Sequence, residues 1–83
     1  MAYRLTLKPS AEKQREKIPS VSKKKIYSIL TAIISDPFQG RKLEGQYKGY
    51  SGIRAWPYRI IYSVRARESL VIVIRIAYRH GSY

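Results

Sequence analysis

Residues 50–79 constrain the fold most strongly, because they form three runs that are rich in β-branched and aromatic residues. The runs cover residues 50–56, 58–65 and 70–79. Trp56-Pro57 separates the first two, and a mostly polar segment from Arg65 to Ser69 separates the last two, as is typical of turns. Strands that are joined by such short turns pair in antiparallel fashion. The pattern therefore predicts an antiparallel sheet at the C-terminal end.

The order of residues within each run predicts which face of the sheet each side chain occupies, because side chains alternate between the two faces. The apolar face would carry Ile53, Ala55, Tyr58, Ile60, Tyr62, Val64, Leu70, Ile72, Ile74, Ile76 and Tyr78. The opposite face would carry Tyr50, Arg54, Trp56, Arg59, Ile61, Arg65, Val71, Val73, Arg75, Ala77 and Arg79. We expect helices to cover the first face and arginines to gather on the second.

The N-terminal half predicts one strand and two helices. Residues 3–8 alternate between apolar and polar side chains, which is typical of a strand with one buried face. Pro9-Ser10 begins a helix that Pro19 stops after Lys17. A second helix starts with Ser20 or Ser22 as its cap and closes at Asp36-Pro37. Its apolar residues follow helical spacing: Ile26, Ile29, Leu30, Ile33 and Ile34.

The connection between the helices and the sheet is predicted to be a loop. Residues 38–49 contain three glycines and carry the basic residues Arg41, Lys42 and Lys48. The predicted order is therefore βααβββ, an α+β fold in which a two-helix hairpin packs on one face of an antiparallel-rich sheet. A chain of 83 residues forms one domain, residues 1–83.

The charge of the chain indicates an acidic partner. Seventeen Lys and Arg residues against five Asp and Glu residues give a formal net charge of +12. A nucleic acid, an anionic membrane surface and an acidic protein would all be attracted to this charge. The absence of cysteine excludes disulfides and thiol catalysis, and the scattered acidic residues predict no metal site. No run approaches the about 20 apolar residues of a membrane span, so we expect a soluble cytoplasmic protein.

Arginines on one sheet face indicate what that partner is. Like charges on neighbouring strands repel, so an anion is expected to offset the repulsion. A guanidinium stays protonated and binds a phosphate with two parallel hydrogen bonds. The basic run Lys23-Lys24-Lys25 is interpreted as a solvated helix face instead. Trp56 has two open interpretations, closing a hairpin or stacking on a base.

Three short motifs resemble the RelE/ParE toxins of bacterial and archaeal toxin–antitoxin pairs. Lys42-Leu43-Glu44-Gly45 is similar to K-L-x-G, Tyr58-Arg59-Ile60-Ile61-Tyr62 to Y-R-[IV]-[IL]-Y, and Arg79-His80-Gly81-Ser82-Tyr83 to R-x-x-x-Y. Their order, together with βααβββ, extends the likeness over nearly the whole chain. The resemblance implies a RelE-like fold of the microbial ribonuclease type.

Within this family the resemblance favours the RelE branch. Such toxins cut mRNA in the ribosomal A site, without a metal or cofactor, when a 2′-hydroxyl attacks the adjacent phosphodiester. Carried over by motif, Arg59 and Arg79 would hold the scissile phosphate, Tyr83 would be the general base, and Arg54 would supply a further basic group. The remaining candidates for RNA binding are Lys48, Trp56, Arg75, His80, Arg41 and Lys42.

The resemblance also implies partners: a cognate acidic antitoxin, the 70S ribosome with its mRNA, and operator DNA only for the toxin–antitoxin complex. Two positions depart from the family pattern. Gly52 stands where strongly cleaving members have a second basic residue, so Lys48 would substitute for it. Tyr78 stands where many members have a histidine, which leaves His80 as a replacement.

Two other functions stay open at the level of the sequence. A ParE-like inhibitor of DNA gyrase would keep the fold and the strand Tyr-Arg pair without chemistry of its own. A non-catalytic RNA-binding protein would use the same basic face for attraction alone.

Overall fold

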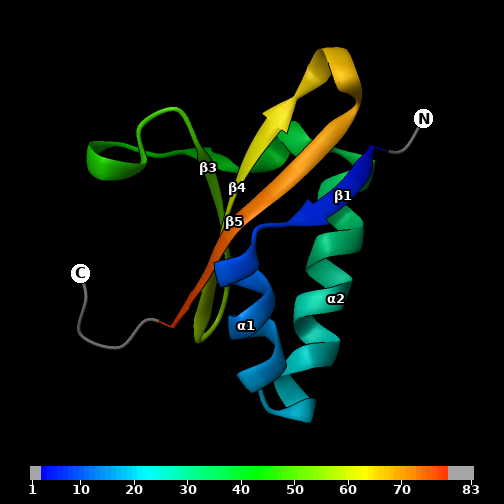
Figure 1. The fold of residues 1–83 in the computed structure, drawn as a ribbon, viewed down its shortest axis with the longest axis vertical. Coiled ribbons are helices and arrows are strands. Elements are labelled where there is room, and N and C mark those ends of the chain that lie inside the picture. Colours follow the sequence, from blue (N-terminus) through cyan, green and yellow to red (C-terminus); the bar gives the residue numbers. More distant parts are fainter. Residues whose placement is uncertain (1–2, 79–83) are drawn as a thin grey trace.

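Two helices and one mixed sheet make up the part of the chain that this computed structural model describes, residues 3–78 (Figure 1). The main elements in order are β1 (Arg4–Leu7), α1 (Pro9–Lys17), α2 (Ser20–Ser35), β2 (Arg41–Lys42), β3 (Ser51–Ala55), β4 (Tyr58–Arg65) and β5 (Leu70–Tyr78). Three short 3-10 turns lie between them: η1 (Pro37–Gln39), η2 (Gly45–Tyr47) and η3 (Ala66–Glu68). The α+β class and the βααβββ order are confirmed, and β2 is an additional short strand within the expected loop.

The sheet places the first and the last of the described strands, β1 and β5, side by side. Its strand order is β1-β5-β4-β3-β2. β1 runs parallel to β5, with Arg4 opposite Leu70, and all other neighbours are antiparallel. A parallel pair needs a crossover, and the two helices provide it between β1 and the rest of the sheet.

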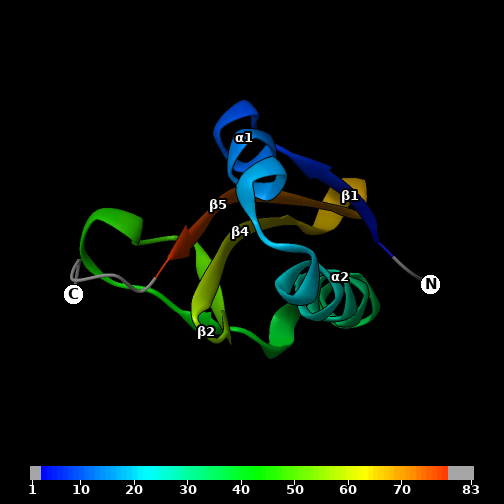
Figure 2. The same cartoon turned by 90° about the horizontal axis from the view of Figure 1, so that it is seen from below.

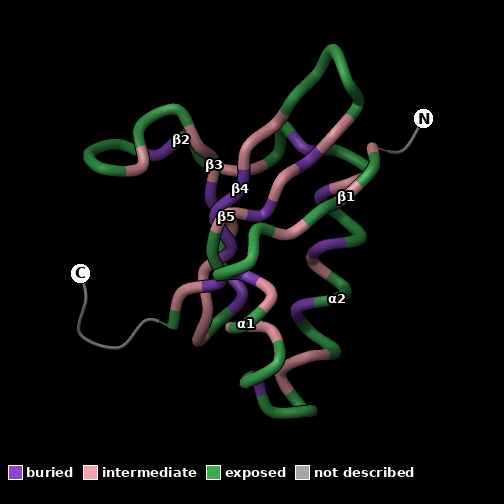
Figure 3. Tube along the Cα trace, in the orientation of Figure 1, coloured by how far each residue is buried: buried purple, intermediate pink, exposed green. Residues whose placement is uncertain are grey.

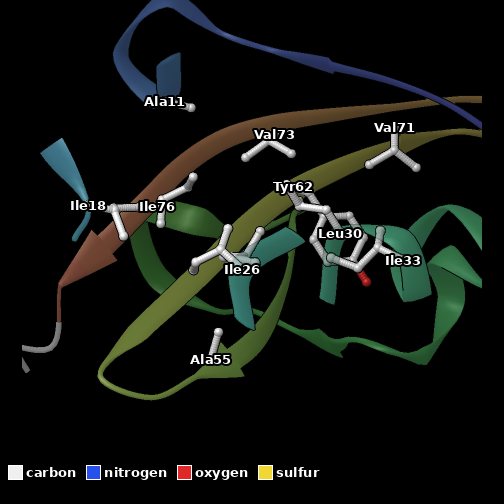
Figure 4. Close-up of a cluster of buried hydrophobic side chains, with 11 residues drawn as sticks. Ala11, Ile18, Ile26, Leu30, Ile33, Ala55, Tyr62, Val71, Val73 and Ile76 are labelled. Atoms are coloured by element: carbon white, nitrogen blue, oxygen red, sulfur yellow. The ribbon is translucent and has the colours of Figure 1, made fainter. Parts of the chain in front are cut away.

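Both helices cover the same face of the sheet (Figures 1 and 2). Ala11 and Ile18 come from α1 and its end, and Ile26, Leu30 and Ile33 form the buried stripe of α2. They pack on the central strands, where Ile60, Tyr62, Val71, Val73 and Ile76 are buried (Figure 4). Burial of each large apolar side chain stabilises the fold by about 1.5–3 kcal/mol.

The start of α2 differs from the prediction in one detail. Pro19 occupies the N-cap position, and its carbonyl oxygen accepts hydrogen bonds from the amides of Ser22 and Lys23. No serine side chain caps the helix, so the predicted serine cap was wrong. Its end was predicted correctly at Asp36, whose carboxylate accepts a hydrogen bond from the Phe38 amide.

The predicted faces of β5 were wrong for the first half of the strand. Val71 and Val73 are fully buried in the core, whereas Leu70, Ile72 and Ile74 are only half-buried. The cause is an irregularity in the pairing with β4: Ile61 lies opposite Arg75, but the next residue, Tyr62, lies opposite Val73. Ile74 is therefore an extra residue, as in a β-bulge, and the alternation of faces changes there. Beyond it, Ile76 is in the core as predicted.

Exposure varies along the chain in agreement with this architecture. Buried positions concentrate where the helices meet the strands, whereas the segment around η2 is largely exposed (Figure 3). No helix within residues 3–78 is long and apolar enough to cross a membrane.

Candidate nucleic-acid interface

Four strands place arginines on the sheet face that the helices leave uncovered. The pairing register aligns Arg41, Gly52, Ile61 and Arg75 in one row across β2, β3, β4 and β5. A second row aligns Arg54, Arg59 and Ala77. Residues that are directly opposite in a sheet project from the same face. Arg41, Arg54, Arg59 and Arg75 therefore share one surface, which we call the arginine face.

Side chains within residues 3–78 form two hollows on the arginine face, and the two meet at Arg59. Arg41, Gly52, Arg54 and Arg59 line the first, which we call the arginine hollow. The second, which we call the tyrosine hollow, is lined by Gln46, Tyr47, Arg59, Ile61, Arg75, Ala77 and Tyr78. Arg59 lines both hollows and is half-buried, whereas Arg41, Arg54 and Arg75 are exposed.

No carboxylate neutralises the arginine face within residues 3–78. The ion pairs there join Arg15 to Glu12 and Arg65 to Glu68, and neither involves the arginine face. Arg54 and Arg59 lie directly opposite each other on adjacent strands, where like charges destabilise a sheet. A bound anion would remove this repulsion and accept hydrogen bonds from both guanidinium groups.

The loop between β2 and β3 packs on the arginine face through one buried side chain. Leu43 is buried, and its side chain fills the space beside Gly52, where an added β-carbon would lie 3.1 Å from a Leu43 methyl carbon. Ile61, next to Gly52 across the sheet, is also buried. Gly52 therefore leaves room for Leu43, which gives a physical reason for the absence of a second basic residue on β3.

Tyr47 lies beside the arginines, although no pattern in the sequence indicates that it belongs to the site. Its hydroxyl accepts a hydrogen bond from Nη1 of Arg75 at 3.1 Å, and its ring lies 6.5 Å from that of Tyr50. The order of apolar and polar residues in residues 38–49 does not indicate that this part of the loop bends back over β4 and β5. The only signal was the motif segment just before it, from Lys42 to Gly45.

The other predicted site residues are distributed as follows. Lys42 and Lys48 line a separate hollow with Tyr50 and Ser51, and Lys42 pairs with Ser51 in a row that continues to Tyr62 of the core. Trp56 is 54% exposed in the turn between β3 and β4, where its carbonyl oxygen accepts a hydrogen bond from Lys25. Arg79, His80 and Tyr83 lie outside the described residues.

Comparison with known proteins defines the family. The model of the ParE toxin of type II toxin–antitoxin systems, parDE, matches residues 5–83. A search of curated proteins gave no match.

Solved structures of toxins share the fold. A chain of the toxin–antitoxin complex RelBE2 from Mycobacterium tuberculosis aligns with a TM-score of 0.85 at 18% identity, covering 95% of this chain and all of that one. An E. coli RelE mutant, in complex with a peptide of the antitoxin RelBc, gives 0.80 at 27% identity, with coverages of 99% and 88%. The YoeB/ParE toxin from Agrobacterium tumefaciens gives 0.79 at 22% identity, with coverages of 90% and 96%. The expected RelE-like fold is confirmed, and this chain belongs to the ParE toxins of type II toxin–antitoxin systems, within the RelE/ParE superfamily.

Proposed function

We propose that this toxin is an endoribonuclease that cuts mRNA on the ribosome without a metal. The observation that carries the proposal is Arg59: it is half-buried, joins the two hollows of the arginine face, and lies opposite Arg54. The 27% identity to E. coli RelE over nearly the whole chain and the Tyr58-to-Tyr62 motif support the same function.

The proposed chemistry is attack of a 2′-hydroxyl on the adjacent phosphorus. The bond from phosphorus to the 5′-oxygen breaks, and a 2′,3′-cyclic phosphate remains. Arg59 and Arg54 would bind the non-bridging oxygens and stabilise the negative charge that grows on them in the transition state. By motif, Tyr83 would take the proton of the 2′-hydroxyl, and Arg79 would bind the phosphate and donate a proton to the leaving oxygen. No step needs a metal ion.

Primer extension on a translated mRNA tests the proposal, with Arg59→Ala compared with Arg65→Ala. Both changes remove one positive charge from β4, but Arg65 lies at the far end of the strand and pairs with Glu68. Wild type and Arg65→Ala should produce cuts in phase with codons. Arg59→Ala should slow cutting by about 100-fold or more, the usual effect of losing one preorganised charge donor.

Two results would contradict different parts of this proposal. The absence of codon-phased cuts by the wild-type toxin would contradict cleavage itself, whereas equal cutting by Arg59→Ala and Arg65→Ala would contradict the role of Arg59. Full toxicity of the double variant Arg79→Ala with Tyr83→Phe would exclude the proposed roles of these two residues.

The second candidate function is inhibition of DNA gyrase, and the match to the ParE family model favours it. An inhibitor of this kind would bind gyrase and perform no chemistry. A supercoiling assay with purified gyrase separates the two functions. If a stoichiometric amount of toxin inhibits supercoiling and leaves translated mRNA uncut, the toxin is a gyrase inhibitor and the endoribonuclease proposal is wrong.

We also propose that a cognate acidic antitoxin is the physiological partner. The net charge of +12 and the arginine face favour an acidic protein, and the related RelE chain is in complex with an antitoxin peptide. Operator DNA would bind only to the toxin–antitoxin complex. Co-expression of a short acidic protein encoded beside the toxin gene should restore growth, and failure to co-purify with the toxin would contradict the pairing.

A further inference from the structure

We propose that the tyrosine hollow binds one nucleobase of the RNA, with Tyr47 as the stacking residue, while the neighbouring arginine hollow binds a phosphate. This inference rests on the proposed function and extends it from the backbone of the substrate to one of its bases. It assigns a role to Tyr47, which none of the sequence motifs includes.

The lining of the hollow combines the groups that a nucleobase requires. Ile61 and Ala77 provide an apolar floor on the sheet, Tyr47 provides an aromatic ring, and the amide of Gln46 provides a donor and an acceptor for a base edge. The volume of the hollow is about 300 Å³, so it has room for a single base. A site for phosphate alone would need neither the apolar floor nor the ring.

Tyr47 is held in place before any ligand binds. Its hydroxyl accepts the hydrogen bond from Arg75, and its ring contacts the ring of Tyr50 at an interplanar angle of 57°. The side chain is half-buried although most of the loop around it is exposed. A ring that is already ordered loses little entropy on binding, so stacking on it is more favourable than stacking on a mobile side chain.

Arg59 connects the base to the phosphate. Because its side chain lines both hollows, a nucleotide with its base in the tyrosine hollow has its backbone beside the arginine hollow. A base in a duplex is stacked and paired, so only an unpaired base can enter. The arrangement therefore selects single-stranded RNA and orients it relative to Arg54 and Arg59.

An abasic scan tests the base pocket directly. The probe is a fluorescent RNA tetranucleotide with 2′-O-methyl groups, which prevent cleavage, and each base is removed in turn. For the wild-type toxin, removal of one particular base should weaken binding by at least about fivefold, the lower end of the stacking effect of one base. Tyr47→Phe keeps the ring and should keep most of this difference. Tyr47→Leu should bind the complete and the abasic RNA equally.

Control variants distinguish loss of stacking from loss of structure. Tyr27→Ala removes a tyrosine from the exposed side of α2, in the other layer of the protein, and should leave the abasic effect unchanged. Circular dichroism checks that Tyr47→Leu is folded. If it is not, Tyr47→Trp, which should preserve or increase the abasic effect, replaces it in the comparison.

The outcomes separate this inference from the proposed function. The base pocket is overturned if no single base matters to the wild-type toxin, or if Tyr47→Leu weakens complete and abasic RNA by the same factor. Codon-phased cutting together with base-independent binding would overturn the pocket alone. Base-dependent binding without any cutting of translated mRNA would overturn the proposed function alone.

Discussion

Gly40 and Tyr62 form a contact whose energy can be tested by a double-mutant cycle. Tyr62 is fully buried in the core (Figure 4). Its hydroxyl donates a hydrogen bond of 2.8 Å to the carbonyl oxygen of Pro37. A β-carbon at Gly40 would overlap this hydroxyl oxygen and lie 3.1 Å from the ring carbon that bears it. The segment after α2 is thus attached to the sheet at a point where only glycine fits.

The two single changes should each destabilise the fold for different reasons. Gly40→Ala forces the hydroxyl to move, and overpacking of this kind costs about 1–3 kcal/mol. The φ of −73° at Gly40 is suitable for alanine, so the lower entropy of the unfolded chain offsets about 0.4–1 kcal/mol of that cost. Tyr62→Phe leaves the buried carbonyl of Pro37 without its partner, which costs about 1–3 kcal/mol.

The double variant should be more stable than the sum of the single effects predicts. Once the hydroxyl is gone, the closest remaining neighbours of the new β-carbon are the ring carbon at 3.1 Å and the carbonyl oxygen of Gly52 at 3.2 Å. These contacts are tight but do not overlap. Gly40→Ala should therefore cost less in the Tyr62→Phe protein than in the wild type, by about 1 kcal/mol or more.

Urea unfolding followed by circular dichroism measures all four proteins of the cycle. Tyr58→Phe is the matched control, because Tyr58 lies on the same strand and its hydroxyl does not contact Gly40. The effects of Gly40→Ala and Tyr58→Phe on the free energy of unfolding should be additive. An equal cost of Gly40→Ala in the wild-type and Tyr62→Phe proteins, within about 0.5 kcal/mol, would refute the packing argument.

Three further outcomes are expected. Burial raises the pKa of Tyr62. The buried neutral phenol therefore stabilises the fold fully below the unfolded pKa of about 10, and this stabilisation is lost as the pH rises through the folded pKa. In Tyr62→Phe the free energy of unfolding should depend less on pH in the alkaline range. Ser69 has a φ of 49°, so Ser69→Gly should raise the melting temperature and Ser69→Val should lower it. Arg54→Ala should reduce the salt slope of single-stranded RNA binding by about 0.7, and an unchanged slope would remove Arg54 from the phosphate contacts.

The sequence predicted the helices and the strands of this protein well, because their signals are local. The apolar spacing from Ile26 to Ile33 and the proline at position 37 define α2 without help from the rest of the chain. The faces of β5 could not be obtained in this way. Residues 70–74 are apolar on both sides, so alternation carries no information there, and the irregular pairing at Ile61 and Tyr62 is a property of two strands together.

The candidate site was predictable where it lies on strands and not where it depends on the loop. The alternation of side chains along the strands predicted that Arg54, Arg59 and Arg75 share one face, and the pairing register of the strands places them on one face. Arg41 joins them only because β2 forms, and a strand of two residues leaves no pattern in a sequence. Tyr47 reaches the arginine face because Leu43 anchors the loop beside Gly52, a contact between residues on different elements.

The parallel pairing of β1 with β5 has a consequence for how the protein folds as it is synthesised. β5 lies between β1 and β4 in the sheet, yet among the strands within residues 3–78 it comes last in the sequence. Arg4 can pair with Leu70 only after all the residues between them have been synthesised. Contacts between residues so far apart in the sequence slow folding. A nascent chain without residues 70–78 lacks the strand on which both sides of the sheet pair. The arginine face, to which β5 contributes Arg75, can therefore be complete only after residues 70–78 have been synthesised.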